Sequence, residues 1–140
     1  MHLVCAHCFS VNNVPDHRLA DQPKCGHCKQ SVLAGHPIEL SAANFDRFIS
    51  RNDMPVVVDF WAPWCGPCRS FAPLFAQAAQ IESDHFRFAK VDTEAETTLA
   101  ARFGIRSIPT LAIFRNGQEV NRVSGALPAR QFAEWLAQFA

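Results

Sequence analysis

Residues 56–68 constrain the fold of this chain more than any other stretch. Positions 56–61 are β-branched or aromatic except for Asp59, which is typical of a strand buried on both faces. They lead into Trp-Cys-Gly-Pro-Cys at positions 64–68. An amphipathic pattern from near Cys65 to about residue 81 then predicts a helix that Pro73 kinks. A strand that enters a helix through Cys-x-x-Cys is a site for reversible thiol–disulfide exchange.

The two thiols of this motif have different expected roles. A thiolate attacks disulfides, and the unpaired N–H groups at a helix N-terminus favour the anion, so Cys65 is the expected nucleophile. Cys68 lies one turn into the helix, where it is shielded, and is expected to resolve the mixed disulfide. Gly66 permits a tight turn, and Pro67 suits the first turn of a helix. The alternative is a structural disulfide or half of a metal site.

Asp59 and Lys90 are candidates for the accompanying proton transfer. Asp59 lies between Val58 and Phe60, so burial is expected to raise its pKa. Such a carboxyl can take the proton of Cys68 and return it, directly or through a water molecule. Lys90, on the next predicted strand, is expected to tune Asp59. The alternatives are an exposed carboxylate at a strand end and a solvated surface lysine.

Pro109 precedes another apolar segment. A proline at the entry to a strand is a candidate for a cis peptide bond, which exposes nearby backbone groups, while an ordinary trans turn proline is the alternative.

The other periodic segments are also typical of strands and helices. Ser41 is a candidate cap for a helix to about residue 51, with Phe45, Phe48 and Ile49 on one face. Strands are predicted at 86–91, 110–114 and 118–124, and Asn-Gly at positions 116–117 predicts a type I′ turn between the last two.

Two further helices complete the pattern. Positions 93–96 fit a capping box before a helix that ends at Phe103-Gly104. Pro128 suits the first turn of a last helix, whose apolar face contains Phe132, Trp135, Leu136 and Phe139. The order β-α-β-α-β-α-β-β-α predicts an α/β fold. We expect a mixed central sheet whose first strands are parallel and whose last two form an antiparallel hairpin. Helices are expected to flank this sheet.

Composition changes abruptly near residue 36. Residues 1–36 hold four of the six cysteines, five of the six histidines and a single aromatic residue, Phe9. The other 104 residues hold two cysteines and fourteen Phe and Trp residues. The front segment cannot bury enough apolar area to fold alone, so a separate source of stability is expected there.

Charge and hydropathy exclude several classes of protein. The formal net charge is zero, so there is no electrostatic reason to expect a nucleic acid or an anionic membrane as partner. No apolar stretch approaches the ~20 residues that span a bilayer. The first residues do not resemble a secretory signal, which leads us to expect a cytosolic protein. In that compartment, cysteines are metal ligands or catalysts more often than structural disulfides.

The four front cysteines form two matched motifs, Cys-Ala-His-Cys at 5–8 and Cys-Gly-His-Cys at 25–28, sixteen residues apart. This spacing matches a structural zinc site with four thiolate ligands, Cys5, Cys8, Cys25 and Cys28. Metal binding would then supply the missing folding free energy. His7 and His27 are expected to be spectators, although His can replace Cys as a ligand.

A second redox centre at Cys25 and Cys28 is the alternative, because disulfide isomerases use the same tetrapeptide. That segment, however, lacks a buried strand and flanking tryptophans. Two roles stay open for a zinc segment. It is either a redox sensor that loses its metal on oxidation, or a packing cap or partner-binding surface.

Residues 38–140 resemble the thioredoxin family. The resemblance is carried by residues 58–68, Ala-Pro at 72–73, Lys-Val-Asp at 90–92, Ile-Pro-Thr at 108–110, and Gly125. It implies a thioredoxin fold and a protein-disulfide reductase with Cys65 as nucleophile, Cys68 as resolving thiol and Asp59 as buried proton carrier. It also implies a cis Pro109 beside a surface that docks extended client proteins. That surface comprises Trp64, Gly66, Pro67, Ile108 and Gly125.

The resemblance further implies recharging by an NADPH-dependent flavoprotein reductase, so NADPH acts indirectly and no organic cofactor is bound. The first 36 residues resemble the extension of zinc-containing two-domain bacterial thioredoxins of the thioredoxin 2 type. We therefore expect a zinc-binding, zinc-ribbon-like domain at 1–36, a thioredoxin domain at 37–140, and a monomer.

Two other functions compete with the reductase. One is a zinc ribbon that recruits a partner, with the thioredoxin fold as scaffold, although a scaffold needs neither Cys65 nor Cys68. The other is a disulfide isomerase or oxidase, which the Gly-Pro spacer disfavours, because an intervening His would make the pair more oxidising.

Overall fold

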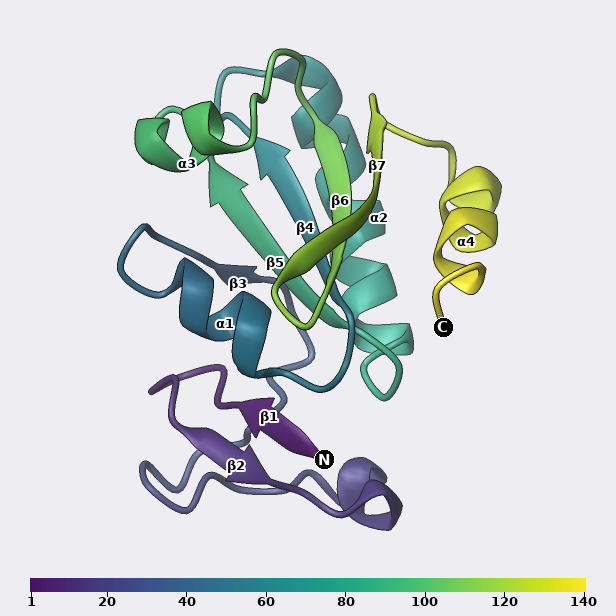
Figure 1. Ribbon diagram of the computed structural model, residues 1–140. Coiled ribbons are helices and arrows are strands. Elements are labelled where there is room, and N and C mark those ends of the chain that lie inside the picture. The colour runs from purple at the N-terminus through teal and green to yellow at the C-terminus, as the bar shows by residue number, and fades with distance from the viewer.

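The computed structural model describes residues 1–140 and contains two β-sheets (Figure 1). An antiparallel hairpin lies at the N-terminus, and a short 3-10 helix, Asp16–Asp21, follows it. A five-stranded sheet has the strand order β3-β5-β4-β6-β7. The strands are β1 (His2–Val4), β2 (Val11–Asn13), β3 (Ile38–Glu39), β4 (Val56–Trp61), β5 (Arg87–Asp92), β6 (Thr110–Arg115) and β7 (Gln118–Ser124).

The large sheet is mixed, as predicted. β3, β5 and β4 are parallel, whereas β6 is antiparallel to β4, and β7 is antiparallel to β6. Four helices complete the expected β-α-β-α-β-α-β-β-α order, in which β3 is the first strand. They are α1 (Phe45–Arg51), α2 (Gly66–Ile81), α3 (Thr97–Arg102) and α4 (Ala129–Ala137). None of them combines the length and the apolar composition needed to cross a membrane.

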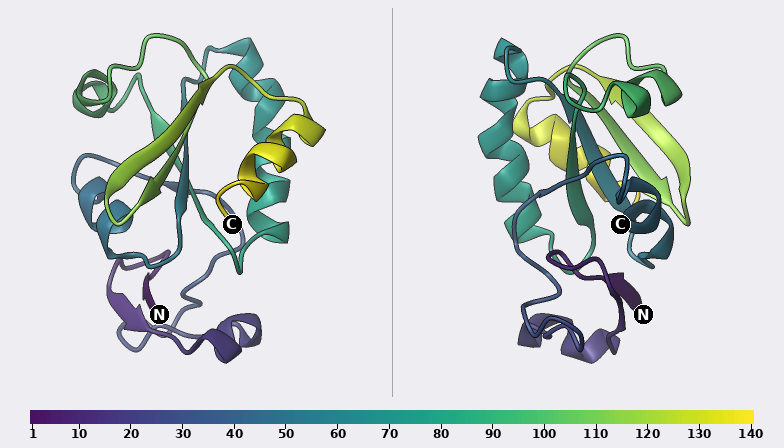
Figure 2. Two further views of the ribbon diagram at one scale, coloured as in Figure 1. Left: turned by 45° about the vertical axis from the view of Figure 1, so that its right-hand side comes forward. Right: turned by 90° about the vertical axis from the view of Figure 1, so that its left-hand side faces the viewer.

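The two faces of the sheet are covered by different helices. α2 and α4 lie on one face, and α1 and α3 lie on the other (Figure 2). Side chains alternate along a strand, so Val56, Val58 and Phe60 of β4 pack in the core with α1, while Val57 packs with the phenylalanines of α2. β4 is therefore buried on both faces, which explains its nearly continuous apolar sequence.

Several turn predictions are confirmed. Asn116 and Gly117 both have positive φ, 52° and 82°, as a type I′ turn requires, and they connect β6 to β7. Gly104 follows α3 with φ of 59°. Pro128 stands one position earlier than expected, at the N-cap of α4. α2 continues through Pro73 as one helix.

The predicted starts of α1 and α3 are wrong. α1 begins at Phe45, not next to Ser41, whose hydroxyl accepts a hydrogen bond from Ala43 N within a preceding turn. The capping box at 93–96 does not form. Asp92 instead accepts the backbone N–H groups of Glu94 and Ala95, and α3 begins at Thr97. The two N–H groups that the box would use are bonded to backbone carbonyls, that of Thr93 to Trp61 O and that of Glu96 to Asp92 O.

The N-terminal segment is joined to the large sheet by buried contacts. Leu3, Val14 and Val32 form a small core together with Met54 from the loop before β4. Val4, at the end of β1, belongs instead to the large core under α1. The first 36 residues therefore pack directly against the rest of the chain.

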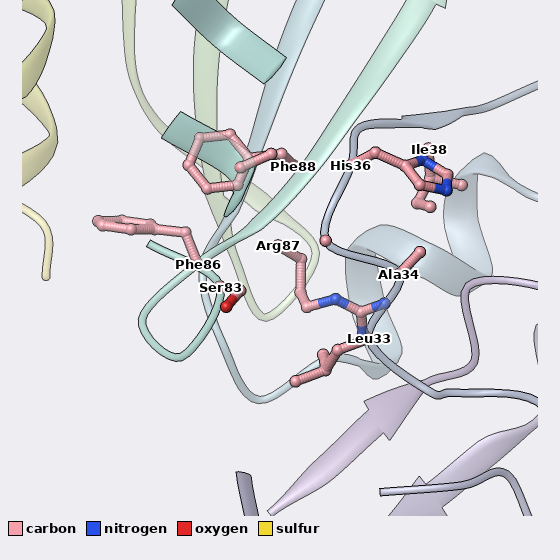
Figure 3. Close-up of a pocket in the computed structure, with 10 residues that line it drawn as sticks. Leu33, Ala34, His36, Ile38, Ser83, Phe86, Arg87 and Phe88 are labelled. Carbon is pink, nitrogen blue, oxygen red and sulfur yellow. The ribbon is translucent and has the colours of Figure 1, made fainter. Parts of the chain in front are cut away.

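Arg87 is the buried link between the two parts. Its guanidinium donates to Val4 O at 2.8 Å, to Asn52 Oδ1 at 2.7 Å and to Val32 O at 3.3 Å. It also stacks 4.9 Å from the centre of the Phe48 ring. Figure 3 shows the side chain running from β5 toward the segment around Leu33, beside a small cavity of about 20 Å³. Burial lowers the pKa of Arg87 to about 10, so the group stays charged at neutral pH.

Candidate active site and metal-binding site

Cys65 and Cys68 form a disulfide at the N-terminus of α2, with their Cα atoms 5.2 Å apart. Cys65 is the N-cap of the helix, and its sulfur accepts a hydrogen bond from Cys68 N at 3.2 Å. A helix N-terminus stabilises a thiolate at this position once the bond is reduced. In the disulfide form both residues are buried, 4% and 2% exposed, so exposure differs little between them.

The predicted docking residues surround Cys65. Trp64 is 66% exposed, and Gly66 and Pro67 are exposed beside it. The Ile108–Pro109 bond is cis, and Ile108 O lies 3.8 Å from the sulfur of Cys65. Gly125 donates its N–H to Pro109 O at 2.8 Å, which places the start of the β7–α4 loop at the same site.

Asp59 is fully buried, and neither of its carboxylate oxygens has a hydrogen-bond partner. Burial raises its pKa to about 7; Lys90 partly offsets this effect, and Glu39 adds to it. Asp59 is therefore the buried carboxyl with a raised pKa that the sequence predicts. The alternative, an exposed carboxylate at a strand end, is wrong. A carboxyl that is half ionised near neutral pH suits a group that both accepts and returns a proton.

Lys90 lies next to Asp59 in the sheet, in direct register with it across β5 and β4. It is partly buried, and its ammonium group lies 4.3 Å from the centre of the Trp61 ring. The ammonium does not hydrogen-bond to Asp59, whose oxygens are both unpartnered, so it influences that carboxyl through space.

The four front cysteines converge as a second cluster. Their sulfurs all lie within 4.8 Å of one another, and the pairs Cys5–Cys28 and Cys8–Cys25 are 3.7 and 3.6 Å apart. Tetrahedral zinc with Zn–S bonds of about 2.3 Å requires sulfurs about 3.8 Å apart. These cross-loop contacts fit one shared metal ion better than a Cys25–Cys28 redox pair.

The two loops that hold these sulfurs repeat one geometry. In each, the third residue, His7 or His27, donates its backbone N–H to the first sulfur, at 3.4 and 3.3 Å. The fifth residue of each loop, Phe9 or Lys29, has positive φ, 63° and 67°. The histidine rings are not part of the sulfur cluster.

The pKa values of the clustered thiols also indicate that a cation is needed to hold all four as thiolates. Although burial raises the pKa of Cys25, hydrogen bonds from the Cys28 and His27 backbone and from Asn12 lower it to about 6. The N–H of Gln30 favours the Cys28 thiolate, but burial and the neighbouring thiols raise its pKa to about 11. Four thiolates therefore do not coexist here without a metal ion, and the donor set is the one zinc prefers.

Comparison with known proteins identifies both parts of the chain. Residues 36–138 match the family described as Thioredoxin, and residues 4–30 match the zinc-ribbon family described as Thioredoxin 2, N-terminal. Thioredoxin C-3 of Corynebacterium nephridii is 49% identical over 138 residues, which cover 99% of this chain and 94% of that protein. The chain belongs to the thioredoxin family. As a member of that family it is a thiol–disulfide oxidoreductase, a protein-disulfide reductase.

Shorter relatives match about two thirds of the chain. Thioredoxin 1 of Synechococcus elongatus is 48% identical over 94 residues, which cover 67% of this chain and 88% of that protein. The solved structure of Malassezia sympodialis thioredoxin (Mala s 13) superposes with a TM-score of 0.66. It is 34% identical and covers 72% of this chain and 88% of its own.

Sequence reasoning missed several residues of this thioredoxin. Glu94 accepts the indole N–H of Trp64 at 2.7 Å and so orients the exposed ring. Asn12 donates to the sulfur of Cys25 at 3.4 Å and accepts Gly26 N at 2.9 Å. Arg87 had a visible signal, a charged residue inside the apolar segment 86–91, whereas nothing in the sequence pointed to Asn12.

Proposed function

We propose that this thioredoxin reduces client disulfides through Cys65, Cys68 and Asp59. The thiolate of Cys65 attacks one sulfur of the client disulfide, that S–S bond breaks, and the released client thiolate takes a proton. Cys68 then gives its proton to the ionised Asp59 and attacks the sulfur of Cys65. The mixed disulfide breaks, the second client sulfur leaves as a thiolate and takes the proton back from Asp59, and the Cys65–Cys68 disulfide holds the oxidation equivalent. Two electrons pass to the client, with one proton from Cys68 through Asp59 and one proton, on the first client thiolate, from solvent.

The single observation that carries this proposal is the position of Asp59. A buried carboxyl without hydrogen-bond partners, on the strand that leads to the Cys65–Cys68 motif, has a pKa of about 7. Lys90 tunes that carboxyl. Trp64, Gly66, Pro67, Ile108, Pro109 and Gly125 form the surface on which an extended client segment docks.

The reducing equivalents come, in this proposal, from a flavoprotein thioredoxin reductase that uses NADPH, and the protein binds no organic cofactor itself. It acts as a monomer in the cytoplasm, without nucleic-acid or membrane partners. A reducing compartment suits four free thiols that must stay available to a metal.

The N-terminal domain, residues 1–36, binds one zinc ion through Cys5, Cys8, Cys25 and Cys28, and residues 37–140 form the thioredoxin domain. The two family matches, at 4–30 and 36–138, support this division. Zinc would supply charge compensation and folding free energy to the two loops.

Reduction of insulin with a thiol donor tests the redox proposal. Cys65→Ser should reduce turnover to the uncatalysed background, because no nucleophile remains. Cys68→Ser should trap a mixed disulfide with the client, visible by mass spectrometry without reductant, because the resolving thiol is gone. Ser70→Ala, an exposed change on the same helix, should retain full turnover. Equal activity in Cys65→Ser and the unmodified protein would exclude the reductase mechanism.

A further inference from the structure

Three ionisable residues form one row across the sheet beneath the N-terminus of α2. Glu39 of β3 is in register with Lys90 of β5, and Lys90 is in register with Asp59 of β4. Residues in register on neighbouring strands project from the same face. On its other side Asp59 is in register with Leu111, an apolar residue of β6. The charged neighbours of Asp59 in the row therefore all lie toward β3.

Exposure changes along this row. Asp59 is fully buried, Lys90 is partly buried, and Glu39 is exposed at the edge strand. The buried residues of α2, which covers this face, are Cys68, Phe71, Phe75 and Ala79, so the Cys68 thiol is the one titratable group among them. Only Lys90 and Glu39 act on the Asp59 charge from neighbouring strands.

The carboxyl of Glu39 interacts with other charged residues near this row. Partial burial of the carboxyl raises its pKa, the charge of Lys90 lowers it, and the charge of Asp92 raises it. The buried indole N–H of Trp61 makes no hydrogen bond. Lys90, over the Trp61 ring, thus lies among two carboxyls and an aromatic face.

We propose that Glu39 is a positioning residue for the proton step, and that its carboxylate competes with Asp59 for the charge of Lys90. This inference rests on the proposed role of Asp59. When Glu39 is ionised, it neutralises part of the Lys90 charge and repels a second anion in the row. Asp59 therefore holds its proton up to a higher pH than Lys90 alone would permit. The ionised fraction of Asp59 available to receive the Cys68 proton is thus set partly from the edge of the sheet.

A carboxyl titration of the reduced, full-length protein tests this inference. The carboxyl carbon of Asp59 is followed by NMR in the unmodified protein, in Glu39→Gln and in Glu134→Gln. Glu134→Gln is the matched control, because it removes one exposed carboxylate on α4, away from the row. Two strand spacings separate Glu39 from Asp59 by about 10 Å, so Glu39→Gln should lower the Asp59 midpoint by about half a pH unit. Glu134→Gln should leave it unchanged.

An Asp59 midpoint that is the same in Glu39→Gln and Glu134→Gln overturns the inference. The pH profile of mixed-disulfide resolution by Cys68 then separates this inference from the proposed function. If the pH profile of resolution moves to lower pH together with the Asp59 titration, the result supports both the proton role of Asp59 and its coupling to Glu39. If the titration moves and the profile does not, Asp59 is not the proton carrier. The proposed proton step and the role of Glu39 in it then fail, while the electrostatic coupling between Glu39 and Asp59 holds.

Discussion

At the scale of single residues, the environment of Asp59 decides how the site handles protons. The carboxyl lies in an otherwise apolar strand, without a hydrogen-bond partner, on the sheet face covered by α2, which has Cys65 as its N-cap and contains Cys68. Burial of an unpartnered carboxyl favours its neutral form. The folded protein therefore tolerates this residue at a cost in stability, and that cost depends on pH.

Asp59→Asn should remove this pH dependence. The folded pKa of about 7 is above the usual value of 3.8, so the contribution of Asp59 to stability is fully present below pH 4. It is lost as the pH rises toward 7 and stays constant beyond. The loss is about 4 kcal/mol in total. In denaturant titrations, the variant should gain stability over the unmodified protein at pH 8 and differ little from it at pH 4.

Asp84→Asn is the control for this measurement, because Asp84 is an exposed carboxylate in the turn between α2 and β5. It should show a stability curve parallel to that of the unmodified protein. A parallel curve for Asp59→Asn as well would mean that Asp59 titrates normally in the folded state.

At the scale of elements, the interiors of helices and strands and the start of α2 were predictable, whereas the starts of α1 and α3 were not. A nearly continuous apolar run identified β4, and Asn-Gly identified the β6–β7 hairpin, because both signals are local. The box at 93–96 failed because its side chains bind distant partners. Thr93 donates to Trp61 O, and Glu96 accepts Ala42 N. Sequence propensity could not anticipate those long-range contacts.

The two cysteine loops are elements whose role can be tested by metal analysis. The purified protein should contain one zinc, which the Cys65→Ser/Cys68→Ser double variant retains and Cys5→Ser loses, because a closed site needs all four sulfurs. His7→Ala is the matched control and should keep its zinc, because only the backbone N–H of His7 contacts the cluster. Zinc retained in Cys5→Ser but lost in the double variant would place the metal at the other pair.

At the scale of the whole molecule, Arg87 joins the two domains. Its guanidinium bonds to Val4 and Val32 of the N-terminal segment and to Asn52 of the thioredoxin domain, and Val4 precedes the cluster residue Cys5. Asn52 in turn accepts Val4 N at 2.8 Å and donates to Phe48 O at 2.7 Å. The N-terminal domain is thus fixed to the thioredoxin domain by a buried polar network.

Arg87→Met should weaken this joint. The variant keeps an apolar stem but removes three buried hydrogen bonds donated by a charged group, so the unfolding free energy should fall by about 2–4 kcal/mol. Limited proteolysis should also cut the segment 33–37 faster. Arg130→Met, at a 91% exposed side chain on α4, should change the unfolding free energy by less than about 0.5 kcal/mol. The same proteolysis rate and stability in both variants would mean that Arg87 does not hold the domains together.

The sequence alone determined the Cys-x-x-Cys pair at 65–68, the two matched cysteine motifs of the N-terminal segment, the buried carboxyl and the order of elements, because each depends on local spacing or on the apolar residues of a strand. Only the tertiary structure placed Glu39 in line with Lys90 and Asp59, and Arg87 beneath the first strand. Glu39 and Asp59 are twenty positions apart, and Arg87 and Val4 are eighty-three apart. Electrostatic coupling and desolvation depend on distance in space, which the chain acquires only when the sheet forms.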